Sequence, residues 1–191
     1  MTIARSFLWL LLALPAVVMI AGGDVATALL QPTGEASLLL IIAALLPGPL
    51  ADAFGRNRLL RTWLGVRRNL GVAGCLYGVL HLLFYVIDMG QLAAMLDEAS
   101  LPAIWTGWIA LALLVAAASI SFDRAMRMLG RRWKHIQRVV YGALLLALVH
   151  WTLLDRAAGP ALVHLAPLLI AWSLRGWARK TRGIVMEGSK A

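Results

Sequence analysis

Six apolar stretches divide the chain, and short polar segments separate them. Apolar residues run continuously through each stretch, whereas the strands of a membrane barrel alternate apolar and polar residues. A continuous apolar run of about 20 residues predicts a transmembrane helix. The predicted spans cover residues 6–22, 35–53, 68–86, 103–122, 135–154 and 160–177. We therefore expect an all-α integral membrane protein, with residues 1–191 forming one domain, a six-transmembrane-helix bundle.

Composition supports a membrane protein. Hydrophobic residues make up 61% of the 191 residues and charged residues 14%, which is too little charge for a soluble domain. A net charge of +9 could indicate nucleic acid binding, but the basic residues lie between the apolar spans. We interpret them as determinants of topology and expect no nucleic acid partner. The single cysteine excludes a disulfide framework and a Cys-x-x-Cys-His attachment site for haem.

The charges alternate from loop to loop. Residues 52–67 and 123–134 hold four and five arginines and lysines, whereas residues 23–34 and 87–102 hold none. The positive-inside rule then predicts that both termini lie in the cytoplasm. We interpret the N-terminal apolar stretch as the first span, since no cleavage site of small residues follows it. Pro47 and Pro49 predict a kink near the end of the second span.

Two histidines lie inside predicted spans that run in the same direction. His81 and His150 each lie ~20 Å beyond the cytoplasmic start of their span, at 1.5 Å of rise per residue. Imidazoles at equal depth on two helices suit the axial ligands of a b-type haem. Gly74 and Gly78 share a face with His81 and are expected to leave room for the flat macrocycle. Hydrogen bonding between helices is the alternative role for both histidines.

The other candidate residues carry weaker signals. His164 and His135 fall near span ends, where an interfacial position is the simplest interpretation. Tyr85 is a candidate for orienting groups at the outer haem edge. Arg67 and Arg68 are candidates for binding lipid or quinone headgroups. Zinc would need more ligands at one depth, and hydrolysis would need a paired serine or carboxylate, so we expect neither.

Several short motifs resemble one known family. They are Arg67-Arg68-x-Leu70-Gly71, Leu80-His81-Leu82-x-x-Tyr85, Leu129-Gly130-Arg131-Arg132-Trp133, Val140-Tyr141 and His150-Trp151. In this order and spacing they resemble the ferric reductase-like transmembrane domain superfamily. Within it they are most similar to the MsrQ or YedZ group, the haem-binding membrane subunits of periplasmic methionine sulfoxide reductase systems. The resemblance extends from about Pro32 to the end of the sixth span.

This resemblance implies a six-helix bundle with b-type haem between the third and fifth helices, ligated by His81 and His150. It implies an electron-transfer subunit rather than a stand-alone enzyme. Electrons would come from the quinol pool or from a cytoplasmic flavin reductase and pass to a periplasmic molybdenum enzyme. The alternatives are an accessory subunit of a larger membrane complex and a ferric reductase-type transmembrane component.

The sequence departs from the family at a second, inner haem site. Relatives usually carry a histidine where this chain has Gln137, and His135 lies two residues earlier, about 200° around the helix. Two-haem members of the superfamily have another histidine where this chain has Arg67. We therefore expect a single haem b, near the outer face. A donor quinone near that haem is then favoured over FMN bound at the cytoplasmic side.

Overall fold

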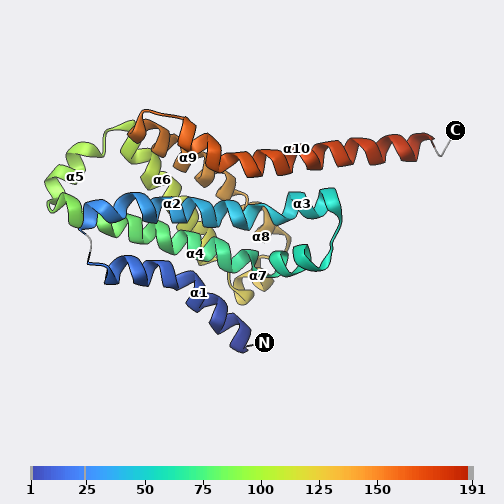
Figure 1. The fold of residues 1–191 in the computed structure, drawn as a ribbon, viewed down its shortest axis with the longest axis horizontal. Helices are drawn as coiled ribbons and strands as arrows, with labels where there is room; N and C mark the ends of the chain where they lie inside the picture. The colour runs from blue at the N-terminus through green and yellow to red at the C-terminus, as the bar shows by residue number, and fades with distance from the viewer. Residues whose placement is uncertain (1, 24, 189–191) are drawn as a thin grey trace.

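The computed structural model describes residues 2–23 and 25–188, and every regular element within those ranges is an α-helix (Figure 1). The helices are α1 (Thr2–Ala21), α2 (Ala26–Leu45), α3 (Pro47–Phe54), α4 (Arg58–Met89), α5 (Leu92–Glu98), α6 (Pro102–Ser119), α7 (Asp123–Leu129), α8 (Arg131–Ile136), α9 (Val139–Asp155) and α10 (Gly159–Gly188). The predicted all-α class is confirmed.

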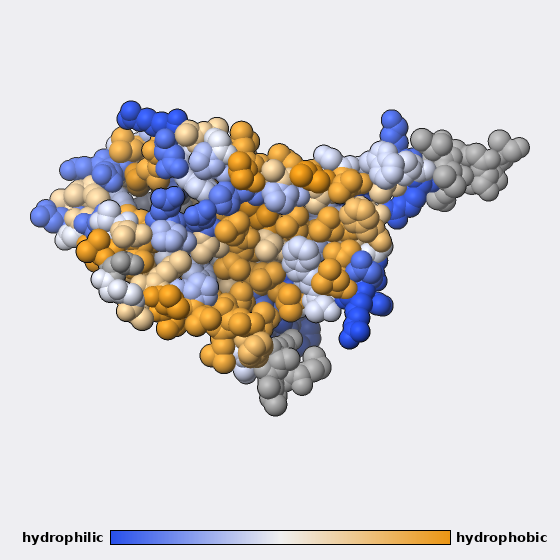
Figure 2. All heavy atoms as spheres, viewed as in Figure 1, coloured by the Kyte–Doolittle hydropathy of each residue, from blue (hydrophilic) through white to orange (hydrophobic). Residues whose placement is uncertain are grey.

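Five helical stretches in the described part of the chain are long and apolar enough to cross a membrane. They are Ala26–Phe54, Arg58–Met89, Pro102–Ser119, Arg131–Asp155 and Gly159–Arg182. The first predicted span corresponds to a shorter apolar helix, Ser6–Ala21. A membrane crossing by this first helix, which would bring the total to six, remains a prediction. Figure 2 shows apolar surface over the middle of the molecule and hydrophilic surface towards both ends of its long axis. The chain is a multi-pass membrane protein.

Two helical stretches extend beyond the predicted spans, because polar residues continue the helices. The second span begins at Ala26 rather than at residue 35, since the Thr33 hydroxyl donates to the Leu29 carbonyl at 2.6 Å and remains buried within the helix. The third begins at Arg58 rather than at residue 68. There the Asn57 side chain caps α4 by accepting a hydrogen bond from the Leu60 amide at 2.9 Å.

Proline positions shape the first two spans. The predicted kink is present, since α2 ends at Leu45 and Pro47 begins α3. In α1, Pro15 lies beside a place where the Tyr77 hydroxyl of α4 is hydrogen-bonded to the α1 backbone. That hydroxyl donates to the Leu12 carbonyl at 2.9 Å and accepts from the Ala16 amide at 3.0 Å. A side chain inserted between such a pair bends a helix, and Figure 1 shows α1 bent beside α4.

The spans pack as two close pairs, α2 with α4 and α6 with α9 (Figure 1). Small groups allow the close approach of α2 and α4, where the Ser37 hydroxyl donates to the Gly74 carbonyl at 2.7 Å. The apolar core joins the two pairs and α10, and it contains Leu38, Ile41, Ile42, Leu45, Cys75, Leu114, Ala143, Leu144, Leu148, Ala161 and Leu168. This arrangement directs side chains of α4 and α9 towards each other.

At the end of the molecule that carries the basic segments, α10 is tied to α3. Arg175 and Arg179 lie 2.9 Å and 3.1 Å from the same carboxylate oxygen of Asp52. Both pairs are partly exposed, so each contributes little to stability by itself. They fix the direction in which α10 leaves the bundle, visible in Figure 1.

Candidate functional site

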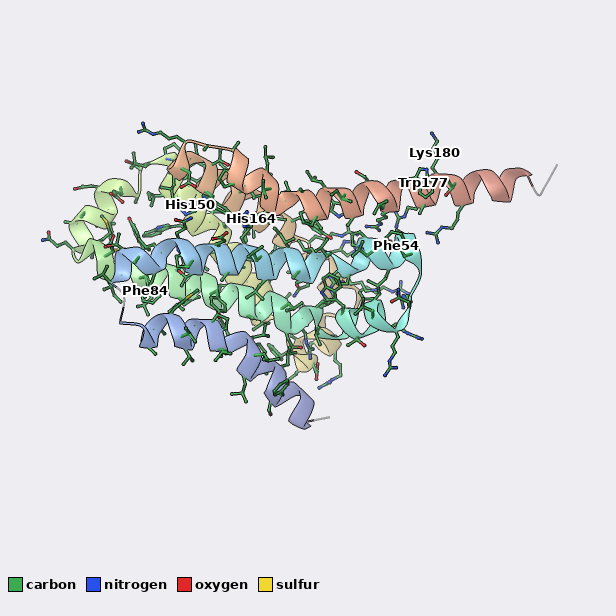
Figure 3. The ribbon with its side chains drawn as sticks, viewed as in Figure 1. Phe54, Phe84, His150, His164, Trp177 and Lys180 are labelled. Carbon is green, nitrogen blue, oxygen red and sulfur yellow. The ribbon has the colours of Figure 1, made fainter. Side chains whose placement is uncertain are left out.

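His81 on α4 and His150 on α9 meet between the two helix pairs. Their ring centres lie 6.2 Å apart, and the ring planes are at 85° to each other. His81 lies eight positions before the end of α4, and His150 lies five positions before the end of α9. At the rise of an α-helix these offsets are about 12 Å and about 8 Å. Because the ring centres are so close, the two rings lie at a similar depth near one end of the bundle, where Figure 3 labels His150.

Backbone carbonyls fix the orientation of both imidazoles. His81 Nδ1 lies 2.8 Å from the carbonyl oxygen of Leu30, and His150 Nδ1 is hydrogen-bonded to the carbonyl oxygen of Ala103. A carbonyl only accepts, so Nδ1 carries the proton in each ring and Nε2 carries a lone pair. Histidines that bind metals are held in this way, with the second nitrogen donating to a carbonyl or carboxylate.

Two glycines on the neighbouring helices make room for the rings. A Cβ on Gly34 of α2 would lie 3.1 Å from His81 Nδ1. A Cβ on Gly107 of α6 would lie 2.7 Å from His150 Nδ1. Any side chain at Gly107 would therefore displace the imidazole. We did not predict either glycine, although an isolated glycine inside a predicted helix is a signal for close packing.

The spacing of the rings fits two ligands on one metal. An imidazole–metal bond is about 2.0 Å long, and a ring nitrogen lies about 1.1 Å from its ring centre, so two rings in line on one metal have centres about 6 Å apart. The observed 6.2 Å matches this separation. Among the described residues no group of three or more His, Cys, Asp or Glu side chains could hold a metal ion. A pair of imidazoles is instead the donor set of a haem with two axial histidines.

Comparison with known proteins gives the family. A model described as "Ferric reductase like transmembrane component" matches residues 33–148, which include both histidines. The chain belongs to the ferric reductase-like transmembrane family. The segment matched covers more than half of the chain. No solved structure matches the chain significantly.

Relatives within the ferric reductase-like family carry the name protein-methionine-sulfoxide reductase heme-binding subunit MsrQ. The chain is 34% identical to the one from Cronobacter sakazakii over 157 residues, 77% of this chain and 76% of that protein. It is 32% identical to the one from Bordetella pertussis over 160 residues, 80% of this chain and 76% of that protein. With the Rhizobium meliloti protein it shares 34% identity over 142 residues, 71% of this chain and 63% of that relative. The resemblance inferred from the motifs is confirmed.

The two glycines expected to face the haem instead lie at helix contacts. A Cβ on Gly74 would lie 2.9 Å from Ile41 Cγ1 of α2, so this residue serves the packing of α2 against α4. A Cβ on Gly78 would lie 3.1 Å from Leu111 Cδ1 and 3.3 Å from Ser37 Oγ. In the structure α2 lies against this face of α4, so a position for Gly74 and Gly78 facing a haem stays a prediction.

His164 differs from the other two histidines of the spans. Its Nδ1 lies 2.8 Å from the Pro160 carbonyl, one turn back in α10, and its Nε2 lies 2.8 Å from Oε1 of Glu35 on α2. The His164 ring also contacts the Trp151 ring, with centres 5.0 Å apart. Glu35 was not predicted as a site residue, because the sequence placed it at a span boundary.

At the inner end, the three positions considered for a second haem lie apart in their surroundings. The Gln137 side chain donates to the Ala117 carbonyl at 2.9 Å and to the Ser121 hydroxyl at 3.0 Å. His135 lies exposed at the end of α8, and Arg67 is exposed on α4. The structure does not bring these three side chains together.

The remaining candidates stabilise contacts between helices. Arg68 Nη1 lies 2.5 Å from Asp123 Oδ1, and this pair borders a cavity of about 380 Å³ that Trp9, Asn69 and Ser121 also line. The cavity is compatible with the lipid or quinone headgroup expected at Arg68. The Tyr85 hydroxyl donates to Glu98 at 2.9 Å, which ties α5 to α4 at the other end of the span.

Proposed function

We propose that the chain is a b-type haem electron-transfer subunit of the membrane, in which His81 and His150 are the axial ligands of one haem. The observation that carries this proposal is the meeting of the two rings at 6.2 Å, with Nδ1 of each bonded to a carbonyl. The names of its MsrQ relatives support haem binding. We further propose that the electrons go to a periplasmic partner such as a methionine sulfoxide reductase.

Each part of the site has a definite task in this function. The haem, when bound, supplies one-electron redox chemistry. His81 and His150 would hold the iron through Nε2, and the Leu30 and Ala103 carbonyls keep each ring in the tautomer suited to this. The apolar core beside the site, including Leu144 and Leu148, lowers the local dielectric.

A membrane quinol is the proposed electron donor. His81 lies 14 positions beyond Arg67, which is ~20 Å along α4. A flavin reductase docked on the cytoplasmic face would have to bridge that distance, and Gln137 is bonded to α6 at the inner site. A quinol diffusing in the bilayer can approach the depth of the haem directly. FMN at the cytoplasmic face is the less favoured donor.

The proposed topology has six crossings of a bacterial inner membrane and both termini in the cytoplasm. The contact of Tyr77 with the backbone of α1 supports α1 as the first crossing, because it holds that helix along the transmembrane part of α4. The basic residues of α7 and α8 and those preceding residue 68 gather at the same end of the bundle as Asp52, where cytoplasmic charge is expected.

A second candidate is an accessory subunit of a larger membrane complex that uses the fold for packing. The engagement of Gln137 with Ala117 and Ser121 favours it, since one ligand position of the family here serves a contact between helices. A ferric reductase-type component would share the haem and differ in its acceptor.

An absorption spectrum separates these candidates. We expect the purified chain to carry one haem b, with α and Soret bands that a short-tailed ubiquinol or menaquinol reduces. A chain purified after expression with ample haem supply that shows no such bands would contradict the electron-transfer function and favour the accessory subunit. Reduction of the purified partner enzyme by the reduced chain, followed by the loss of the reduced bands, then tests the acceptor.

A further inference from the structure

Glu35 and His164 form an ion pair at transmembrane depth. Glu35 lies nine positions into α2 and His164 five positions into α10, about 14 Å and about 8 Å from the helix starts at the same end of the bundle. Their facing atoms are 2.8 Å apart, and their side chains are 35% and 18% exposed. Ionisable groups inside a membrane span are costly and commonly belong to functional sites.

The contacts of His164 suit a pair that shares a proton. Its Nδ1 faces the Pro160 carbonyl, which only accepts, so Nδ1 carries a hydrogen. Nε2 and the Glu35 carboxylate would then both be acceptors, and their 2.8 Å contact needs a proton between them. His81 and His150 differ because no hydrogen bond of their Nε2 atoms is found among the described residues. The contacts therefore suit His81 and His150 for metal binding and His164 for carrying a proton.

The pair is adjacent to both proposed haem ligands. Glu35 follows Gly34, whose backbone lies against the His81 ring. His164 contacts the ring of Trp151, the residue after His150. Figure 3 shows His150 and His164 on neighbouring helices at this end of the bundle, and Figure 2 shows hydrophilic atoms in the same region, within the apolar surface. A molecule bound at the pair would therefore lie at the same end of the bundle as the two proposed haem ligands.

The chemistry of the pair selects a hydroxyl donor dissolved in the membrane. Glu35 Oε1 contacts His164, whereas Oε2 has no hydrogen bond among the described residues. A carboxylate oxygen at a partly exposed position accepts a hydrogen bond from an O–H group. We propose that the Glu35–His164 pair binds the hydroxyl of a membrane quinol and accepts its proton when the quinol is oxidised. This inference rests on the proposed electron-transfer function and assigns the site of its donor.

The step balances in protons and electrons. A quinol becomes a quinone by losing two electrons and two protons, and the electrons pass singly to ferric haem, the oxidant. The O–H bond of the hydroxyl bound at the pair breaks with its proton going to Glu35 Oε2, and the proton of the opposite hydroxyl goes to water. The pair then holds one proton more than in the structure and releases one to the aqueous end, where Asp155 accepts a hydrogen bond from Trp151 at 2.6 Å. The electrons leave through the periplasmic partner between the two transfers.

The substitution Glu35→Gln tests this role against a purely structural one. A glutamine amide can donate to neutral His164, so it keeps a hydrogen bond between α2 and α10 but cannot accept a proton. Asp88→Asn is the matched control, because Asp88 is also a carboxylate bonded to α2, through the Thr27 hydroxyl, and it has no histidine partner among the described residues. Both variants are purified with haem, and their dithionite-reduced spectra and thermal unfolding are compared with those of the parent chain.

Two readouts follow. A short-tailed azidoquinol, which has the hydroxyls that Glu35 would bind, is photocrosslinked to the proteins with their haem already reduced. The labelled peptides are mapped and the half-saturating concentration is measured. Reduction of the haem bands by a short-tailed quinol is timed separately. For Glu35→Gln we expect about a tenfold higher half-saturating concentration, since a hydrogen bond to a charged group is lost, and a quinol reduction rate lowered about tenfold or more. Labelling of the parent chain should map to α2 and α10. Asp88→Asn should match the parent in both readouts.

Each contrary result has a distinct meaning. Glu35→Gln with parental labelling and parental reduction by quinol would overturn the inference and leave a structural pair. Labelling at the cavity bordered by Trp9 and Arg68 would also overturn it, because the quinol would then bind at the inner end. Loss of haem bands from the parent chain would instead contradict the proposed function. A parent with haem that dithionite reduces and quinol does not would overturn the quinol donor together with this site, and would leave haem binding intact.

Discussion

The rings of His81 and His150 stand nearly perpendicular, at 85°, with their centres 6.2 Å apart. This relationship combines two independent restraints, since Leu30 orients one ring and Ala103 the other. Because the two carbonyls belong to different helices, neither ring can rotate without breaking its own hydrogen bond. The helix framework thus sets the ligand geometry before the cofactor is considered.

The ring angle predicts the electron paramagnetic resonance spectrum of the oxidised protein. Ferric low-spin haem gives a strongly anisotropic signal with one large g value when its two imidazole planes are perpendicular, and a rhombic signal with well-resolved g values when they are parallel. We expect the anisotropic signal from the purified chain at low temperature, because the planes are at 85°. A rhombic signal would show that the rings do not keep this orientation in the haem protein.

Gly107→Ala should weaken haem binding although Gly107 is not a proposed ligand. The new Cβ would lie 2.7 Å from His150 Nδ1, so the ring must move away from the Ala103 carbonyl. Changes in the groups that orient a metal ligand typically cost 10–100-fold in metal affinity, and we expect haem retention to fall accordingly in a haem titration.

Gly176→Ala is the control for this experiment. A Cβ there has no heavy atom within 4 Å, and alanine is favoured over glycine inside a helix. Its haem content should equal that of the parent chain. Equal haem retention in Gly107→Ala and in the parent would mean that the His150 ring is not held where the structure has it.

Ser37→Ala should destabilise the contact between α2 and α4. The variant removes the buried hydrogen bond to the Gly74 carbonyl, worth about 1 kcal/mol. Unfolding in detergent measures the loss, and Ser119→Ala serves as control because its hydroxyl is exposed and bonds within its own helix. Indistinguishable stability of Ser37→Ala and the parent would contradict this contribution.

Gln137→His should not add a second haem. The histidine would enter a position that contacts Ala117 and Ser121, and the expected partner position on α4 holds the exposed Arg67. Haem and protein assays should therefore still give one haem per chain. A ratio of two for this single variant would show that another residue, with His135 the first to test, completes an inner site.

The histidine pair could be predicted from the sequence, whereas its surroundings could not. Counting residues from the basic segments gives the depth of His81 and His150, because helical rise is regular. The partners Gly34, Gly107 and Glu35 lie on other helices, and no count along one helix gives the rotation at which two helices face each other. Gly74 shows the same limit, since its small size predicts close packing on that face but does not say that the neighbour there is α2.

The helices extend beyond the predicted spans for a related reason. Hydropathy places a boundary where polar residues begin, and Glu35 begins the predicted second span. In the structure Thr33 bonds to its own helix and Glu35 bonds to His164, so polar residues are accommodated within α2. Glu35, the polar residue at which the predicted second span begins, is thus also a member of the Glu35–His164 pair.

The most direct test of the account is the dithionite-reduced absorption spectrum of His81→Ala and His150→Ala beside His135→Ala and the parent. Each of the first two variants should lack the b-type α and Soret bands, because either substitution removes one of the two axial imidazoles. His135→Ala should retain them, since His135 lies exposed at the end of α8. Retention of parental bands by both His81→Ala and His150→Ala would show that the haem, if bound, is held elsewhere.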